Sequence, residues 1–493
     1  MTPEAVRQLA AVAGRPSAPT SERPPAASAS DFDAGPVLGD PPLPTAVDFA
    51  IEAADFPQAP RTFEETGLPE DLVLELLIKT FYSQGDLNAL QASQQMALPF
   101  TVVDALLEHL KREKEVEVKT VDGNGRAFYR YAITGHGRDR AREALDRCQY
   151  VGPAPVPLDV YADWVRRQTV NTTRISWDDL RRGFSHLVLS NRFLMMLGPA
   201  VNSGKSLFLY GPAGNGKTLV AETIAGLLGG EIYVPYAIEV GGQIIKVFDP
   251  VYHQESDPEE GEVPSTGLWK GGRESTDPRW CHTRRPTVFT GGELTLNMLD
   301  LRYNPIAKFY EAPFQVKSNG GVFILDDFGR QLVQPVDLLN RWIVPLEKRV
   351  DYLTLHTGKK FPVPFDCLLI FATNLDPDEL VDEAFFRRIR YKVKADDPTR
   401  EEFSQILFNV CRAKAIKFVP EAVTYLYKRY YGEMGLQPRS CHPRDLMDQL
   451  VDYANFYGVP AVLSKTLLDR ACQSYFVEGN APGKAEEAHA GGF

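Results

Sequence analysis

The sequence predicts an α/β protein: a large, mostly parallel sheet covered by helices, with a small α+β module before it and a helical domain after it. Residues 171–395 alternate short apolar runs with helical patterns, which favours parallel strands joined by crossover helices. One run, Val322–Leu325, is apolar at every position, as expected for a strand buried on both faces. A glycine-rich loop near residue 211 also separates a predicted strand from a predicted helix.

Composition sets the broad class of the protein. The 493 residues suffice for two or three domains of about 100–200 residues each. A hydrophobic content of 44% with 24% charged residues is ordinary for a globular protein and excludes a wholly disordered chain. The net charge of −11 argues against a protein whose whole surface wraps nucleic acid, although a local basic face stays open.

Several segment types are not expected. No apolar run approaches the roughly 18–20 residues of a membrane span, and the N-terminus lacks the apolar core of a signal peptide. The six cysteines are scattered without a CxxC pair, so they indicate neither a disulfide framework nor a zinc site. We therefore expect a cytoplasmic protein with reduced cysteines and no membrane span.

Changes in composition divide the chain into six expected segments. Residues 1–60 are rich in Pro, Ala and Ser and offer few large apolar anchors, so they predict a disordered, flexible tail. Residues 479–493 predict a second tail. Between the tails we expect a small module at 61–150, a proline-containing linker at 151–170, an α/β domain at 171–395 and a helical domain at 396–478.

The small module is expected to contain three helices and a β-hairpin. Apolar spacing predicts helices beginning at Pro69, over 87–95 and over 100–114, and β-like runs follow at 116–121 and 127–133. This order resembles a winged-helix domain. The third predicted helix mixes acidic with basic exposed residues and forms no basic stripe. We therefore expect the module to dock a protein or to regulate, with DNA binding as the alternative.

The strongest motif in the chain is a phosphate-binding loop. Its glycines allow backbone amides to point at phosphate oxygens, and the N-terminus of the following helix adds positive potential. The GxxxxGKT pattern stands between an apolar strand and a helix, as its mechanism requires. Lys217 is expected on the β- and γ-phosphates and the Thr218 hydroxyl on Mg²⁺, so the sequence predicts nucleotide binding. The expected contact residues are Gly211, Pro212, Ala213, Gly214, Asn215, Gly216, Lys217, Thr218 and Leu219.

A second glycine–lysine–serine run, at residues 203–206, matches this pattern only at its end. Pro199 stands where the first glycine of the pattern belongs, and no strand precedes the run. We expect it to form the turn that leads into the strand before the phosphate loop.

Two carboxylates follow the apolar run Val322–Leu325. A carboxylate at the end of a strand beside the phosphate loop can hold the hydrated Mg²⁺, and a neighbouring one can orient and deprotonate an attacking water. We assign Asp326 to the metal and Asp327 to the water. The alternative is a pair of surface aspartates that only cap the strand.

Polar residues also follow later elements. Asn374 ends the apolar run that begins at residue 367 and is expected to bond the γ-phosphate or the attacking water, unless it is a simple turn residue. Arg387 and Arg388 come next, and Arg444 stands at the start of a predicted helix.

Taken in order, these motifs resemble those of the AAA+ ATPases. The loop at 211–218 matches Walker A, Asp326 and Asp327 match Walker B, and Asn374 matches sensor 1. The resemblance covers residues 171–478 and implies a three-layer P-loop core with a helical lid. It also implies a ring, usually of six subunits, in which ATP bound at each interface meets an arginine finger of the neighbour.

The same resemblance assigns the arginines. Arg387 and Arg388 lie in the finger segment, without a choice between them, and Arg444 matches sensor 2. Arginine suits such roles because it is permanently charged and forks onto phosphate oxygens.

Two departures from the family pattern stand out. The usual Asp-Glu of Walker B is Asp-Asp here, so the expected base is one methylene shorter. Lys217 and Asp326 are also 109 residues apart, which leaves room for insertions, among them an expected hairpin over residues 231–248 around Gly241 and Gly242.

Two further segments indicate a clade. Residues 307–321 resemble a helix-2 insertion, and 350–365 resemble a pre-sensor hairpin. Together they resemble the clade of MoxR chaperones, magnesium chelatases and σ54 activators. The GAFTGA loop of the σ54 activators is missing, so MoxR-like proteins are the nearer match.

We therefore expect a cytoplasmic ATPase that forms a homo-oligomeric ring, hydrolyses ATP with Mg²⁺ and remodels or assembles a protein client. The first alternative is a DNA-directed motor or transcriptional regulator that uses the winged helix. The second is a nucleotide switch without turnover, which the Asp-Asp departure keeps open.

Residues 279–285 are expected to serve structure. One Cys-His pair, at 281 and 282, is two ligands short of a zinc site. The nearby Arg279, Arg284 and Arg285 are expected to form an ordinary solvated face, with binding of an acidic partner as the alternative. The tyrosines at 425–431 are expected to pack in the lid.

Overall fold

The computed structural model describes residues 56–121, 125–256, 276–376 and 387–476, all of which belong to the unit that begins at Phe56. The unit is a mixed α/β structure, as the sequence predicts. The tails expected at 1–60 and 479–493 lie outside the described residues, apart from residues 56–60.

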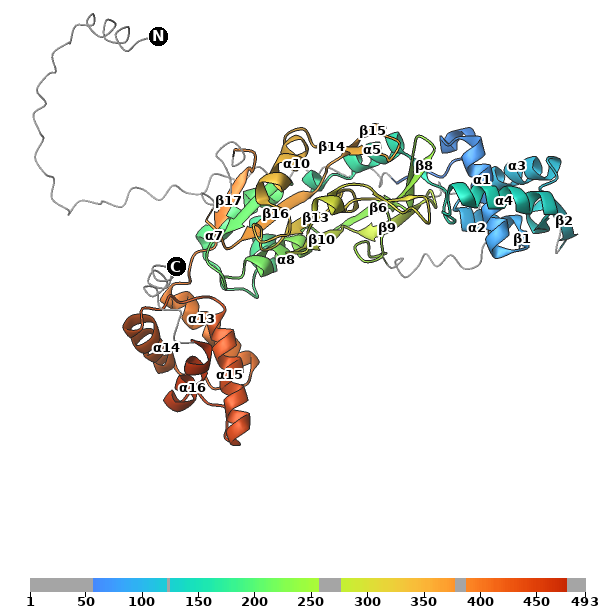
Figure 1. Cartoon of the computed structure of the whole chain (residues 1–493). Coiled ribbons are helices and arrows are strands. Elements are labelled where there is room, and N and C mark those ends of the chain that lie inside the picture. Colours follow the sequence, from blue (N-terminus) through green and yellow to red (C-terminus); the bar gives the residue numbers. More distant parts are fainter. Residues whose placement is uncertain (1–55, 122–124, 257–275, 377–386, 477–493) are drawn as a thin grey trace, which may run out of the picture. The chain divides into compact units, whose positions relative to one another are not determined.

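The central sheet has five parallel strands in the order β10-β13-β16-β5-β17, of which β10, β13, β16 and β17 are labelled in Figure 1. The predicted strand Val322–Leu325 is confirmed as β13, because its four apolar side chains are all buried. The other strands are β5 Ser206–Tyr210, β10 Thr287–Thr290, β16 Leu368–Thr373 and β17 Tyr391–Lys394.

This sheet is the middle of three layers. In β5, Leu207 and Leu209 join the apolar cluster that also holds residues of α7 and α8, whereas Phe208 joins the cluster around Trp342 of α10. Successive side chains of β5 thus pack into two separate apolar clusters, because neighbouring side chains of a strand point to opposite faces of the sheet. The covering helices are α6 Trp177–Gly183, α7 Asn191–Asn202, α8 Lys217–Leu227 and α10 Pro335–Lys348.

A second sheet, in the order β11-β12-β8-β7-β4, is built from residues outside the central one. The hairpin predicted around Gly241 is confirmed as the antiparallel pair β7-β8. The strands are β4 Val156–Pro157, β7 Ala237–Val240, β8 Gln243–Lys246, β11 Arg302–Tyr303 and β12 Tyr310–Glu311. Two strands outside this sheet, β6 Glu231–Pro235 and β9 Trp280–Arg284, pair with each other.

The two segments compared with clade insertions have distinct structures. Residues 350–365 form the antiparallel hairpin of β14 Val350–Thr354 and β15 Lys360–Pro364, as expected. Residues 307–321 contain β12 and the single helical turn α9 Phe314–Lys317. The 3₁₀ turn η3 Val170–Thr172 precedes α6, and the 3₁₀ turn η4 Leu296–Leu299 lies between β10 and β11.

The N-terminal module has the element order α1, β1, α2, α3, β2, β3, α4, with a three-stranded sheet β1-β3-β2. The second helix begins two residues later than predicted, because Leu87 and Asn88 pair with β3 and the Asn88 side chain then caps α2. The helices are α1 Glu70–Gln84, α2 Ala89–Met96, α3 Phe100–Arg112 and α4 Gly135–Arg147. The strands are β1 Leu87–Asn88, β2 Val116–Val121 and β3 Tyr129–Ile133, and the 3₁₀ turns are η1 Glu64–Thr66 and η2 Arg126–Phe128.

Residues 151–170, expected as a linker, contain β4 and the helix α5 Leu158–Arg167. β4 pairs with β7, and the Ala154 amide donates to the Met96 carbonyl of the module at 2.7 Å. This segment is therefore built into the sheet next to the module.

The expected solvated face at residues 279–285 is wrong for two of its three arginines. Arg279 is buried: its guanidinium donates to the Asp277 carboxylate and to the backbone oxygens of Thr66 and Pro155. Arg285 donates to the carbonyls of Gln168 and Gly320. Both arginines donate to backbone carbonyls of elements that are far away in sequence. A local sequence pattern therefore cannot predict that these arginines have internal partners.

The C-terminal helices form one bundle around a shared apolar cluster (Figure 1). Tyr430 and Tyr431 are buried in this cluster, which confirms the expected packing role of the aromatic run. The helices are α13 Arg400–Ala413, α14 Pro420–Leu426, α15 His442–Tyr457 and α16 Lys465–Tyr475, with the π-helical turn η5 Tyr427–Glu433 after α14.

Among the helices in the described ranges, none has the length and apolar character needed to cross a membrane. All six cysteines are free thiols.

Candidate active site

The phosphate loop leaves the carboxyl end of β5 and enters α8. Three glycines of the loop have positive φ angles: 128° at Gly211, 84° at Gly214 and 74° at Gly216. A Cβ at Gly211 would lie 2.6 Å from the Ala395 carbonyl oxygen, and one at Gly214 would lie 2.6 Å from the Cys441 sulfur. Only glycine therefore fits the first two positions, because both conformation and space exclude a side chain.

Lys217 lies inside this loop. Its ammonium donates to the carbonyl oxygens of Gly211 and Pro212, each at 2.9 Å, and the residue is buried. Burial lowers the pKa of Lys217, and the nearby Asp326 and Asp327 oppose that shift. The loop thus holds a positive charge beside two negative ones, as a site for a phosphate–Mg²⁺ complex does.

Thr218, the residue after Lys217, connects the loop to the carboxyl end of β13. The Thr218 hydroxyl donates to Asp326 at 2.7 Å, and the Asp326 amide donates to the Thr290 carbonyl of β10 at 2.8 Å. A hydroxyl and a carboxylate oxygen in contact are a donor pair that fits Mg²⁺, which proteins hold through one or two carboxylates together with substrate phosphates. No group of three or more His, Cys, Asp or Glu residues that could hold a metal ion occurs in the described part of the chain.

Asp327 and Asn374 face each other across the ends of β13 and β16. The Asn374 amide donates to the Asp327 carboxylate at 3.1 Å. Asp327 has a φ of 48°, in the left-handed region that aspartate tolerates better than most residues. These side chains lie at the same edge of the sheet as the phosphate loop, because parallel strands end at one edge. The structure therefore brings together Lys217, Thr218, Asp326, Asp327 and Asn374.

The segment before α15 also meets the loop. The Cys441 amide donates to the Gly214 carbonyl at 2.9 Å, and the Ser440 amide donates to Asn215 at 3.1 Å. The buried Asn215 in turn donates to Asp397 at 2.7 Å, and Asp397 also accepts from Arg439.

Arg439 is a site residue that sequence reasoning missed. It lies close enough to Lys217 for its charge to lower the pKa of that lysine. Arg444, the predicted sensor, has a side chain that is 69% exposed and bonds Asp445 at 3.0 Å. The sequence does place Arg439 three residues before the predicted helix, but no spacing rule would select Arg439 over Arg444 as the site residue.

Arg387 and Arg388 are not part of this group. They precede β17, which runs parallel to β5, and the Arg390 amide donates to Ser206 at the start of β5. The phosphate loop follows the other end of β5, at a rise of about 3.3 Å per residue and hence roughly 16 Å further along.

The remaining predicted loop residues do not bond the carboxylates. Ala213 belongs to the turn of the loop, and Leu219 is 43% exposed on α8.

A cavity of about 340 Å³ opens beside the loop. Its size falls in the range of small-molecule sites, and its lining combines apolar with polar groups. Residues on its wall include Leu189, Phe193, Met196, Tyr210, Asn215, Asp396 and Ser440.

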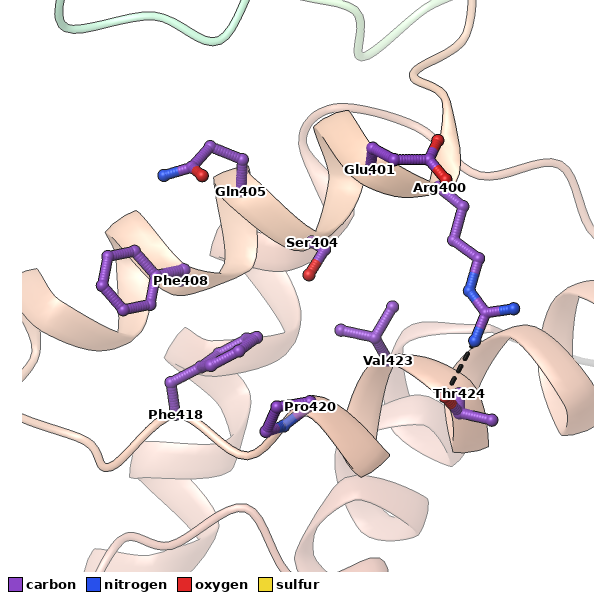
Figure 2. A pocket seen from close by; sticks show the side chains of 9 residues that line it. All are labelled: Arg400, Glu401, Ser404, Gln405, Phe408, Phe418, Pro420, Val423 and Thr424. Atoms are coloured by element: carbon purple, nitrogen blue, oxygen red, sulfur yellow. Dashed lines mark hydrogen bonds between the residues drawn. The ribbon is translucent and has the colours of Figure 1, made fainter.

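Another hollow, of about 570 Å³, lies between α13 and α14. Figure 2 shows its apolar side, with Phe408 and Phe418, and the Arg400 guanidinium that bonds Thr424 at 2.8 Å. No residue of the phosphate loop or of the strand ends lines this hollow, so it is not part of the candidate active site.

Comparison with known proteins identifies one family model, described as "Domain of unknown function (DUF8689)", over residues 399–474. No curated protein matches the chain. Among solved structures, the chain is similar to the RuvB Holliday junction branch migration motor of Thermotoga maritima, with 14% identity over 63% of this chain and 73% of that chain and a TM-score of 0.32. It is also similar to NtrX from Brucella abortus, with 14% identity over 67% of this chain and 66% of that chain and a TM-score of 0.36. Because both TM-scores are below 0.5, the function of this chain is argued from its own residues.

Proposed function

We propose that this protein is an AAA+ ATPase that binds ATP with Mg²⁺ and hydrolyses it at subunit interfaces of a ring. The observation that carries the proposal is the joined pair of contacts Thr218–Asp326 and Asp327–Asn374 at the edge where the phosphate loop leaves β5. In this proposal, Thr218 and Asp326 bind the metal, and the adjacent pair Asp327 and Asn374 orients the water. The motif order and the three-layer core support the same class of protein.

The roles follow from the contacts. The Mg²⁺, when bound, neutralises charge on the phosphate oxygens. Thr218 and Asp326 hold it, and Lys217 donates to the β- and γ-phosphates from inside the loop. Asp327 accepts the proton of the attacking water, while Asn374 orients that water and the Asp327 carboxylate.

The lid supplies a further phosphate contact. Arg439 is the better candidate for this role than Arg444, because it bonds Asp397 next to the loop and its charge acts on Lys217. The cavity beside the loop would hold the base and ribose, with the apolar Leu189 and Phe193 against the base.

The client is proposed to be a protein, as in MoxR-like remodelling. The N-terminal module, winged-helix-like in its element order, has 12 Lys and Arg against 15 Asp and Glu over residues 61–150. On α3, Asp104 and Glu108 pair with Arg126, and Glu108 also pairs with Lys111. The face that would enter a DNA groove is therefore neutralised, which favours a protein partner over DNA.

The test compares nucleotide binding and turnover in the wild-type chain and in Lys217→Ala. Loss of the buried ammonium should weaken ATP binding at least tenfold, as measured by isothermal titration. Lys205→Ala, in the second glycine–lysine–serine run, is the matched control and should keep the wild-type affinity for ATP. Tight ATP binding by Lys217→Ala would contradict the assignment of the loop. Tight binding by the wild type without turnover would instead favour the nucleotide switch.

A further inference from the structure

Four large apolar side chains are exposed around the C-terminal end of α15, and we call them the α15 patch: Phe456, Tyr457, Val459 and Val462. Phe456 is the most exposed of them, at 81%, and its ring centroid lies 5.2 Å from that of Tyr457. Single exposed apolar residues are normal on a protein surface. Four of them within seven residues concentrate apolar surface at one place, which marks a contact with another molecule.

The backbone that carries the α15 patch is fixed. Gly458 ends the helix in the left-handed region, at a φ of 64°, and the Val459 amide donates back to the Ala454 carbonyl at 3.0 Å. This is a common way in which glycine terminates a helix. Phe456 and Tyr457 therefore extend from a preorganised helix end, which lowers the entropy cost of a contact.

The hollow of about 570 Å³ between α13 and α14 offers a matching surface. Phe408 and Phe418 form an aromatic wall at one end of it, with ring centroids 5.5 Å apart in an edge-to-face arrangement (Figure 2). Pro420 and Val423 lie beside this wall. Because Phe408 keeps 41% of its surface exposed, a further aromatic ring can pack on the wall.

The charges next to the two surfaces are complementary. Residues 449–464, which include the α15 patch, contain a single charged side chain, the exposed Asp452. It precedes Phe456 by four residues, so both side chains lie on one face of α15. At the hollow, the Arg412 guanidinium lies over one ring of the aromatic wall, 6.0 Å from its centroid, and Lys417 is exposed in the loop before α14. A carboxylate is thus matched by two cations.

The α15 patch of a chain does not reach the hollow of the same chain. Helix α15 meets the end of α13 through the ion pair Lys414–Asp448 and then continues for about 12 Å to Phe456. None of the described residues that line the hollow belongs to α15. The surface that fills the hollow therefore comes from another molecule, and a second copy of the chain carries one of matching shape and charge.

We propose that the α15 patch of one copy docks in the α13–α14 hollow of a second copy. Phe456 packs on the aromatic wall, and Asp452 pairs with Arg412. The two surfaces differ, so the contact is head-to-tail, and a series of such contacts closes into a ring or extends as an open chain of copies. The contact lies outside the phosphate loop and the strand ends, and the inference does not depend on ATP turnover.

The first experiment measures self-association of the full chain without nucleotide, by sedimentation over a range of protein concentrations. Phe456→Asp changes the α15 patch, and Ser404→Phe fills the hollow, because the Ser404 side chain lines it (Figure 2). Each variant should raise the dissociation constant at least tenfold. Ile306→Asp is the matched control, since it removes an apolar side chain that is 77% exposed between β11 and β12. It should keep the wild-type dissociation constant.

Mixing the two variants tests the head-to-tail geometry. Phe456→Asp chains keep an intact hollow, and Ser404→Phe chains keep an intact α15 patch. The mixture should therefore form a 1:1 heterodimer with the affinity of one wild-type contact, and nothing larger. A contact between two patches would instead leave Ser404→Phe with wild-type self-association, which overturns the proposal.

A charge exchange keeps the proposal testable if Ser404→Phe disturbs the helical bundle. Asp452 and Arg412 are both exposed, so their replacement should leave the melting temperature unchanged. Asp452→Arg and Arg412→Glu should each weaken self-association several-fold, and both substitutions in one chain should restore it. Failure of the double variant to regain association overturns the pairing of these two residues.

The remaining outcomes separate this inference from the proposed ATPase. A wild-type chain that stays monomeric without nucleotide, or wild-type association in Phe456→Asp, overturns the inference and leaves the ATPase in place. The α15 patch then binds a different protein, or another segment of the chain fills the hollow. A chain that associates through patch and hollow but never hydrolyses ATP supports the inference and overturns the proposed function.

Discussion

Asp327 is the residue on which turnover should depend most directly. Its carboxylate lies beside the proposed metal carboxylate and accepts a hydrogen bond from Asn374. The φ of 48° at Asp327 and its contact with Asn374 place this short side chain at the end of β16, where an aspartate can serve in place of the glutamate of the AAA+ pattern that the motifs resemble.

Replacement of Asp327 by asparagine should stop turnover and leave binding intact. The amide has the same shape and still accepts from Asn374, but it cannot take a proton from water. Loss of a general base typically costs about 10²–10⁴-fold in rate. Steady-state hydrolysis and ATP affinity, measured on one preparation, check this prediction. An unchanged rate would move the base to another residue.

Arg439 and Arg444 should differ in their effect on ATP affinity. Arg439→Ala should weaken binding about tenfold or more, because a hydrogen bond to a charged group contributes about 1.5–3 kcal/mol. Arg444→Ala is the internal control and should change the affinity less than about twofold, since its exposed side chain bonds only the adjacent Asp445 among the described residues. Equilibrium titration with a fluorescent ATP analogue measures both values. If Arg444→Ala weakened ATP binding more than Arg439→Ala, the sequence-based assignment of Arg444 would hold instead.

Much of the site was predictable at the level of single residues. Lys217, Thr218, Asp326 and Asp327 follow from a loop and a strand end whose chemistry is fixed by local sequence. Arg439 was not predictable, because its role depends on Asp397 and Asn215, which the fold brings to it from other elements.

At the scale of elements, the apolar runs were the most informative. β13 and β16 were located within one residue because both are buried on both faces. The strands β4 and β9 were missed: β4 has only two residues, β9 mixes polar with apolar residues, and both pair with partners distant in sequence. The buried Arg279–Asp277 pair was missed for a related reason: the acceptors that bury it lie in Thr66 and Pro155.

One contact between elements predicts a pH dependence of stability. His253 Nδ1 accepts from the Asp249 amide, and Nε2 bonds the Lys317 carbonyl, so the neutral ring satisfies both partners. Burial lowers the pKa of His253 to about 4; the facing Lys317 ammonium acts in the same direction, whereas the Asp249 carboxylate opposes it. Above pH 6.5 the ring is neutral in both states. As the pH falls from 6.5 to 4, the unfolded chain binds the proton and the folded one does not, so stability is lost.

This loss should be measurable in urea unfolding. Between pH 7 and pH 5 the His253 contribution amounts to about 2 kcal/mol. His253→Gln should reduce the difference in unfolding free energy between these pH values by that amount. His136→Gln, at the exposed start of α4, is the control and should keep the wild-type difference. If His253→Gln keeps the wild-type difference in unfolding free energy as well, the pKa of His253 is not lowered in the folded chain.

At the scale of the whole molecule, the described contacts connect the N-terminal module with the second sheet. Ala237 and Ile244 of the β7-β8 hairpin belong to the apolar cluster of the module, and Arg279 bonds backbone oxygens on both sides. A partner bound to the module therefore binds next to the second sheet, which also contains β11 and β12.

The most direct test of the account is the specific rate of ATP hydrolysis as a function of protein concentration, with the molar mass of the assembly measured in parallel with and without ATP. The account predicts a rate per subunit that rises as a ring forms, because the proposed sites lie between subunits. A specific rate that is constant from monomer to assembly would contradict the shared site.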